Sequence, residues 1–292
     1  MHVQQAASTT DATELRSFAE YLLRIGNGVE PAVSMGEGLI PDRVRIPERM
    51  LMRRYNTYDL IAAIYGNLST TNLTTELLIS HAILTPKNKD VATLNDKVLE
   101  LFPGEAHEFK SADAIDNPED QIAYPLELLN SLNPSDLPPH SLKLKVGCPV
   151  MLLRNLDTAQ GLCNGTRLIC RSFQQYVLEA DIATGPFAGT TVLIPRISLT
   201  PNENRSPIMF KRTQFPVRLA FSMTINKAQG QTFDSVGLYL PEPPFTHGLL
   251  YVAMSRVRTP SAIHIMVDPE NSQIEGRTGN YTRNVVFREV LL

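Results

Sequence analysis

The chain has 292 residues, of which 43% are hydrophobic and 20% charged, and its net charge is −3. These values are typical of a globular protein with one or two domains, and the slight excess of acid excludes a simple basic DNA-binding module. The polar start Met1–Gln5 and the lack of a long apolar run exclude a secretory signal and a membrane span, so we expect an intracellular protein.

The first part of the chain predicts helices and loops. Residues 11–25 place apolar side chains at helical spacing, and Gly26 ends that helix. A loop with a short strand is expected over 36–47, and a second helix over 59–65. We interpret 1–76 as a helical entry to a lobe, the end of a domain whose earlier part is missing.

A strand, a turn and a helix are predicted next. Residues 77–84 are short and apolar, as in a buried strand, and 90–101 repeat apolar residues at helical spacing. This order is the unit of an α/β sheet, in which ligands bind at the carboxyl ends of the strands. Thr85, Lys87 and Asn88 in the turn are therefore candidate ligand contacts, and a plain helix cap is the alternative.

A turn-rich linker over 133–140 separates this unit from a region of different character. Short β-type runs without any helical pattern follow it, over 150–153, 166–173, 176–182 and 190–197. They predict a small antiparallel barrel or sandwich. The three cysteines of this region, at 148, 163 and 170, form no Cys-x-x-Cys pair, so neither a disulfide framework nor a metal site is expected.

The polar stretch Ser222–Phe233 lies between two apolar segments, 216–221 and 235–240, that predict buried strands. It offers a hydroxyl, a cation, two amides and a flexible backbone position, from Thr224, Lys227, Gln229, Gln231 and Gly230. Such groups can converge on a phosphate, and no nucleophile with a base accompanies them. The predicted chemistry is phosphate or nucleic-acid contact, and a polar surface turn is the alternative.

A second stretch, Tyr251–Arg258, combines an apolar helical pattern with basic residues at its end. Arg256 and Arg258 are expected to emerge at the carboxyl end of a helix over about 246–256. Basic residues also recur without intervening acid at Arg205, Lys211, Arg212, Arg218 and Lys227. This basic run predicts either a local phosphate-binding face or a solvated edge strand.

In this order and at this spacing, the two stretches resemble motifs V and VI of superfamily-one DNA helicases. The closer match is the Pif/RecD-like branch, which includes the helicase part of Helitron transposon proteins. Further matching phrases lie at Ala82–Asn88, Val91–Asn95, Leu144–Asn155 and Gly161–Arg167, and the likeness runs over about 1–268. Met1-His2-Val3 looks like the family phrase Asn-Met-Arg-Val cut short, with His2 where arginine is expected.

The resemblance implies an α/β fold, namely the RecA-like second lobe of a helicase of the P-loop NTPase type, with an inserted small β-barrel that is Src-homology-three-like. The implied boundaries are 1–76 for the entry, 77–146 and 211–268 for the two parts of the lobe, 147–210 for the barrel and 269–292 for a tail. Past 268, we expect 271–282 to be loose. A last short element is expected to dock after it, with the apolar residues Val285, Val286, Phe287, Val290 and Leu291.

The resemblance also assigns residues. Thr85, Lys87, Asn88, Thr224, Lys227 and Gln229 would bind single-stranded DNA, whereas Gly230, Gln231 and Arg256 would face ATP. Arg256 matches the catalytic arginine that reaches the γ-phosphate. The chain contains neither Gly-x-x-x-x-Gly-Lys-Ser/Thr nor a recognisable acidic metal ligand on a neighbouring strand, so ATP and Mg²⁺ are expected only in an intact two-lobe enzyme.

The implied function is 5′-to-3′ ATP-dependent DNA unwinding in DNA repair, recombination, telomere maintenance or transposon replication, in the nucleus or elsewhere in the cell. We expect this chain alone to be inactive, because its partner, the first RecA-like lobe, would be encoded upstream. The alternatives are a non-catalytic module that binds single-stranded DNA or protein, and a non-functional transposon-derived fragment.

Overall fold

The computed structural model describes residues 9–35, 40–68, 73–115, 123–202 and 208–287. It divides into two units. Unit 1 comprises Met1–Asn67, Ser80–Leu94 and Ser222–Leu292, and unit 2 comprises Leu68–Ile79 and Asn95–Phe221. Within the described part of the chain, no helix is both long and apolar enough to cross a bilayer.

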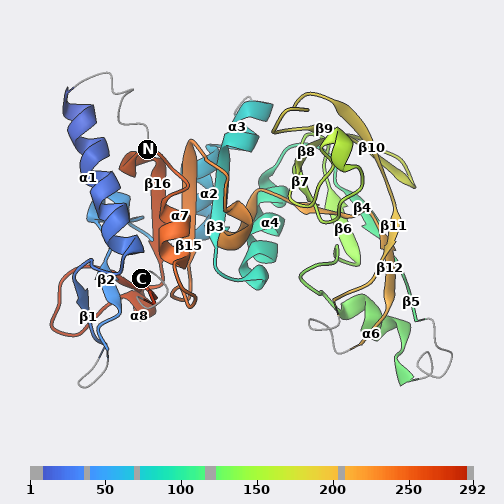
Figure 1. The fold of residues 1–292 in the computed structure, drawn as a ribbon. Coiled ribbons are helices and arrows are strands. Elements are labelled where there is room, and N and C mark those ends of the chain that lie inside the picture. The colour runs from blue at the N-terminus through green and yellow to red at the C-terminus, as the bar shows by residue number, and fades with distance from the viewer. Residues whose placement is uncertain (1–8, 36–39, 69–72, 116–122, 203–207, 288–292) are drawn as a thin grey trace. The chain divides into compact units, whose positions relative to one another are not determined.

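The centre of unit 1 is a four-stranded parallel sheet in the order β14-β3-β15-β16 (Figure 1). Its strands are β3 (His81–Thr85), β14 (Ser222–Thr224), β15 (Ser235–Leu240) and β16 (Ile263–Val267). Consecutive residues of these strands are buried, as expected for a parallel sheet that is covered on both faces. A parallel sheet covered by helices agrees with the α/β fold that the sequence predicts for this part of the chain.

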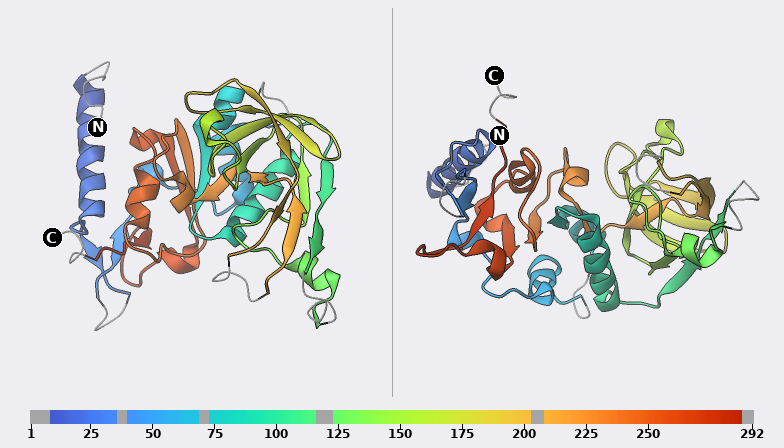
Figure 2. Two further views of the ribbon diagram at one scale, coloured as in Figure 1. Left: turned by 45° about the vertical axis from the view of Figure 1, so that its right-hand side comes forward. Right: turned by 90° about the horizontal axis from the view of Figure 1, so that it is seen from below.

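Helices pack directly on this sheet. Gly237 in β15 is required there, because a Cβ atom at this position would lie 2.9 Å from Ile64 and 3.0 Å from Leu60 of helix α2 (Thr57–Tyr65). Helix α7 (Leu249–Met254) contacts the long helix α1 (Thr9–Gly26), and Figure 2 shows these two helices side by side. The short helical turns of unit 1 are η2 (Glu48–Met50), η4 (Ile225–Ala228), η5 (Pro260–Ala262) and α8 (Pro269–Ser272).

A second, antiparallel sheet of unit 1 joins distant parts of the chain. It has the order β1-β2-β17, with β1 (Ala32–Val33), β2 (Arg43–Arg45) and β17 (Tyr281–Arg283). The loose segment predicted over 271–282 therefore ends in a paired strand. Beyond it, Val285 accepts a hydrogen bond from the backbone of Gly248, and the Phe287 ring stacks on His247 at 5.6 Å. Val290 and Leu291, which were expected to dock with them, lie outside the described residues.

Unit 2 is built on a five-stranded antiparallel sheet in the order β10-β9-β8-β7-β13. The strands are β7 (Pro149–Leu152), β8 (Arg167–Phe173), β9 (Val177–Ile182), β10 (Thr191–Pro195) and β13 (Val217–Leu219). Among the described residues, no pairing joins the edge strands β10 and β13, so this sheet is open and the predicted closed barrel is not confirmed.

Smaller sheets and helices complete unit 2. The order β11-β12-β5 joins Ile197–Leu199, Lys211–Gln214 and Ala112–Ala114, and β4 (His107–Lys110) pairs with β6 (Ser141–Leu144). The helical segments are α3 (Thr75–Ser80), α6 (Leu126–Ser131) and η3 (Thr158–Gln160). Helix α4 (Asn88–Leu101) begins in unit 1 and ends in unit 2. Residues 95–146 therefore belong to the same unit as the antiparallel sheets.

Two members of the basic run, Arg212 and Arg218, do not contribute to a phosphate-binding face. Arg212 is completely buried, and its guanidinium pairs with Asp113 at 2.6 Å while donating to the carbonyls of Leu129, Leu132 and Pro138. Arg218 donates to the carbonyl of Pro134, and burial lowers its pKa. Because a buried guanidinium must have its donors satisfied, these arginines bind the interior of unit 2 instead of a ligand. Arg205 lies outside the described residues.

Candidate nucleic-acid and nucleotide interface

Two predicted ligand-binding segments, the turn over 85–88 and the polar stretch over 222–233, leave neighbouring strands at the same edge of the unit 1 sheet. Strands β14 and β3 are parallel, and Thr224 pairs in register with Thr85 at their carboxyl ends. After Thr85 the chain turns into helix α4, and after Thr224 it turns into η4, which carries Lys227. The carboxyl edge of a parallel sheet is the place where α/β proteins bind ligands.

The two threonines at this edge are buried. Thr85 has no exposed surface, and its hydroxyl has no hydrogen-bond partner in the structure, whereas Thr224 is 9% exposed. Thr224 occupies the position before η4, but its side chain makes no capping hydrogen bond. The accessible members of the predicted set are therefore the exposed Asn88 and Gln229 and the half-buried Lys87 and Lys227.

A glutamate that sequence reasoning missed faces this edge. Glu242, in the loop after β15, forms ion pairs with Lys87 and, at 2.9 Å, with Lys89. The hydrogen bond from Lys87 is the main cause of a lowered pKa of Glu242, and the bond to Glu242 raises the pKa of Lys89. Two cations of the candidate interface thus share one carboxylate, which balances the charge of only one of them. The sequence signal was the position of Glu242, just past the carboxyl end of a core strand.

The loop over 229–234 connects the end of η4 with the amino end of β15. Gly230 lies in it with φ of +82°, a conformation that favours glycine, and a Cβ atom there would meet nothing within 4 Å. The side-chain amide of Gln231 donates to the carbonyl of Lys227 at 3.0 Å, which ties the loop back onto η4.

Arg256 contacts this loop through its guanidinium and through its backbone carbonyl. Its guanidinium donates to the carbonyl of Gln231 at 3.0 Å, to that of Val252 at 2.8 Å and to the hydroxyl of Ser255 at 2.7 Å. Its own carbonyl accepts from the backbone of Phe233 at 2.8 Å. Burial is the main cause of a lowered pKa of Arg256. The structure therefore brings Gly230, Gln231 and Arg256 together, and the loop that carries Gly230 and Gln231 is continuous with η4 and Lys227.

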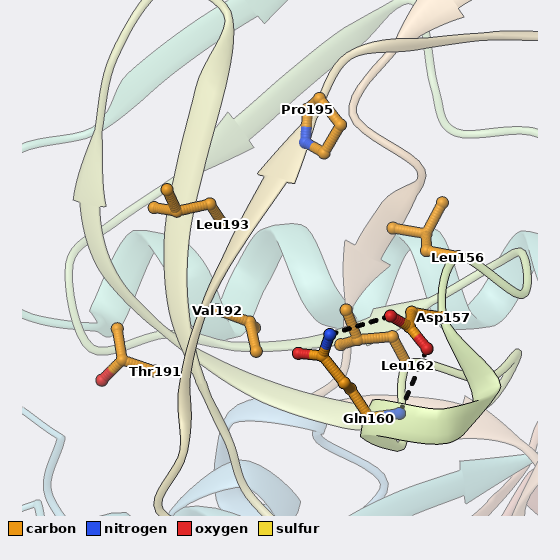
Figure 3. Close-up of a pocket in the computed structure, with 8 residues that line it drawn as sticks. All are labelled: Leu156, Asp157, Gln160, Leu162, Thr191, Val192, Leu193 and Pro195. Atoms are coloured by element: carbon orange, nitrogen blue, oxygen red, sulfur yellow. Dashed lines mark hydrogen bonds between the residues drawn. The ribbon is translucent and has the colours of Figure 1, made fainter.

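Unit 2 contains a separate pocket, which none of the predicted site residues lines (Figure 3). Its volume is about 450 Å³, and its wall consists of Leu156, Asp157, Gln160, Leu162, Thr191, Val192, Leu193 and Pro195. Asp157 accepts hydrogen bonds from the backbone and the side-chain amide of Gln160, so its carboxylate is occupied within the wall. Among the described residues, no group of three or more His, Cys, Asp or Glu side chains is placed to hold a metal ion.

Comparison with known proteins finds similarity to Pif1 helicases. The model of the DNA helicase Pif1 2B domain matches residues 127–173. The human ATP-dependent DNA helicase PIF1 is 33% identical over 181 residues, which make up 61% of this chain and 26% of that protein. The protein of the same name from Xenopus laevis is 30% identical over 206 residues, which make up 70% of this chain and 30% of that protein. These matches support the resemblance of this chain to Pif1-like superfamily-one helicases.

Solved structures of Pif1 helicases share the fold of this Pif1-like chain. The crystal structure of Bacteroides Pif1 bound to single-stranded DNA matches 86% of the chain and 49% of that protein's chain, with a TM-score of 0.55 and 22% identity. The Candida albicans Pif1 helicase matches 86% of the chain and 53% of its own, with a TM-score of 0.54 and 21% identity. The chain spans only 26% and 30% of the human and frog relatives, respectively.

Proposed function

We propose that this chain forms the second motor lobe of a 5′-to-3′ ATP-dependent DNA helicase and binds single-stranded DNA at the carboxyl edge of its parallel sheet. The observation that carries this proposal is the pairing of Thr85 with Thr224. It places the turn over 85–88 and the polar stretch over 222–233 on adjacent strands. The relatives named above are ATP-dependent DNA helicases, and one of the similar structures holds single-stranded DNA.

The DNA contacts are assigned to the accessible groups of this edge. Lys87 and Lys227 supply the cations for phosphate, and Asn88 and Gln229 supply amides that can donate to phosphate oxygens or to bases. Thr85 and Thr224 are buried at the starts of the two turns, so we assign them a structural role. They contact DNA only if the carboxyl edge changes conformation and exposes them.

The nucleotide contacts are assigned to Gly230, Gln231 and Arg256. In an intact enzyme, ATP with Mg²⁺ supplies the phosphoryl group that is transferred to water, and Arg256 would stabilise the charge that develops on it. This chain's residues fit only that side of the site, because the sequence contains no glycine-rich phosphate cradle with a lysine. We therefore infer that a first RecA-like lobe must complete the site, and that this chain alone hydrolyses no ATP.

Binding of a fluorescently labelled oligothymidylate, followed by anisotropy at low salt, tests the DNA site. Replacing both Lys87 and Lys227 with alanine should weaken binding by roughly tenfold, because two phosphate contacts are lost. Arg49→Ala, which removes an ion-paired cation elsewhere in unit 1, is the matched control and should bind like the parent. Equal affinity of all three proteins would refute the proposed site, and DNA-stimulated ATP hydrolysis by the purified chain would refute its dependence on another lobe.

The second candidate function is a non-catalytic module that binds single-stranded DNA or protein through unit 2. It is favoured by exposed apolar side chains on that unit. Leu193, at 67% exposure, lines the pocket of about 450 Å³, and Tyr176 is 65% exposed. In this reading the antiparallel sheets would act as the Src-homology-three-like element of the family. If Leu193→Glu abolished oligothymidylate binding while the double lysine variant kept it, the module would be the better description.

The cellular role remains part of the proposal. A lobe of this kind would act where DNA is unwound, in repair, recombination, telomere maintenance or transposon replication, in the nucleus or another DNA-containing compartment. The non-functional fragment is the opposing case, and calorimetry separates the two. A functional lobe should unfold in a cooperative transition that shifts upward with bound oligonucleotide, whereas a relic should show no such shift.

A further inference from the structure

Two tyrosines form an exposed aromatic pair on unit 1. The rings of Tyr55 and Tyr239 stack with their centroids 6.2 Å apart and their planes inclined by 27°, and their hydroxyls are 3.4 Å apart. Tyr55 is 41% exposed, and Tyr239 is half-buried. Together they present an aromatic surface that is partly exposed to solvent.

This pair lies at the same edge of the sheet as the candidate DNA contacts. Tyr239 is the penultimate residue of β15 and follows Leu238, which pairs with Leu84 near the end of β3. Tyr55 reaches the edge because its segment runs along β16, where the backbone of Met52 donates to the carbonyl of Ile265 at 2.8 Å. The pair therefore extends the carboxyl edge beyond β14 and β3.

The charges around the pair are mixed. Lys89 interacts electrostatically with Tyr239, and the adjacent Arg53 and Arg54 are exposed. On the other side, the negative charges of Asp90 and Asp268 act on Tyr55 and raise its pKa. Burial and the hydrogen bond to Tyr239 are the larger causes of that raised pKa. Negative charge beside the rings disfavours a phosphate at that point, but it leaves a neutral planar group free to stack. Phosphates are better placed at the neighbouring lysines.

We propose that the outer face of the Tyr55–Tyr239 pair is a stacking subsite for one unpaired nucleobase of a strand whose phosphates bind at Lys87 and Lys89. Every base has a π-face, so such a platform accepts any sequence, as a protein that travels along a strand requires. This inference rests on the proposed function, since it assumes that a single strand follows the carboxyl edge.

The absence of tryptophan from the chain provides a site-specific test. Tyr55→Trp gives the chain a single tryptophan, at position 55. The fluorescence of this tryptophan should be quenched when oligothymidylate is added. Leu23→Trp, at a 46% exposed position on helix α1, is the control and should show no quenching. Anisotropy of a labelled oligothymidylate, measured on the same samples, reports binding independently of the tryptophan signal.

Affinity measurements separate the ring from the hydroxyl. Tyr55→Ala should weaken oligothymidylate binding by about tenfold, whereas Tyr55→Phe, which loses only the contact between hydroxyls, should bind like the parent. Matching thermal unfolding of the three proteins excludes misfolding as the cause. If oligothymidylate binds but neither quenches Trp at position 55 nor distinguishes Tyr55→Ala, the subsite is wrong and the DNA-binding lobe stands. If the parent chain binds no oligothymidylate at all, the proposed function fails and the subsite fails with it.

Discussion

At the scale of single residues, the decisive feature of the candidate DNA edge is competition between Glu242 and phosphate. The carboxylate of Glu242 occupies the same ammonium groups of Lys87 and Lys89 that we assign to DNA. All three side chains are at least a third exposed, so water and salt weaken these pairs and a polyanion can displace the carboxylate. Glu242 therefore opposes binding of a single strand without preventing it.

Glu242→Gln should raise the affinity for oligothymidylate by about two- to fivefold at low salt, with the gain shrinking as salt increases. The bond from Lys87 lowers the pKa of Glu242, so the carboxylate stays charged and competes throughout the neutral range, and the competition is lost only as pH falls through that lowered pKa. Parent and variant should thus converge in acid. Glu14→Gln, which removes the partner of Arg49, serves as the control in the same anisotropy titration, and a weaker-binding Glu242→Gln would contradict the model.

At the scale of elements, the loop between β14 and β15 depends on Arg256 for its conformation. Arg256→Ala deletes the guanidinium bonds to Gln231 and Val252, and charge-assisted bonds of this kind contribute about 1.5–3 kcal/mol each. Amide hydrogen exchange of residues 229–231 should accelerate by roughly ten- to 100-fold, while the exposed Arg258→Ala should leave it unchanged. Unchanged exchange in Arg256→Ala would show that the loop holds itself without Arg256.

Elements whose local pattern and tertiary environment agree were predictable from the sequence. The β-type runs over 166–173 and 176–182 appear as β8 and β9, and the apolar segment after Phe233 appears as β15. The run over 77–84 is split instead, because its first half forms helix α3 and only His81–Thr85 enters the sheet. Apolar runs of this length suit either state, and tertiary pairing decides between them.

The candidate site was predictable in its motifs but not in its charges. The order of strand, turn and helix located Lys87, and the polar stretch between two predicted strands located Lys227. The two lie at one edge because the carboxyl ends of parallel strands meet there. Sequence spacing contains no information on the bond of Lys87 to Glu242, 155 residues away, or on the burial of Arg212. Long-range ion pairs and desolvation depend on the folded arrangement, so Arg212 and Arg218 of the basic run were misread as surface residues.

At the scale of the whole molecule, the net charge does not favour DNA, and some of the basic residues are withdrawn from the surface. The chain has 27 Lys and Arg residues against 30 Asp and Glu, so no net field attracts a polyanion. Arg167, Arg212 and Arg218 are further withdrawn, because each donates to backbone carbonyls within unit 2. Binding to a single strand should therefore depend on the two or three lysines of one edge and not on a broad basic surface.

This arrangement predicts a shallow salt dependence. Neutralising about three phosphates of a single strand gives a slope of roughly −2 for the logarithm of the association constant against the logarithm of salt concentration, at about −0.7 per contact. Lys227→Ala should reduce the magnitude of that slope by about 0.7, whereas Arg49→Ala, whose cation is paired with Glu14 elsewhere in unit 1, should not change it. Anisotropy titrations over a series of salt concentrations give both slopes. A parent slope steeper than about −5 would require at least twice as many contacts as this edge offers, and would place much of the binding on a different surface, such as the sheets of unit 2.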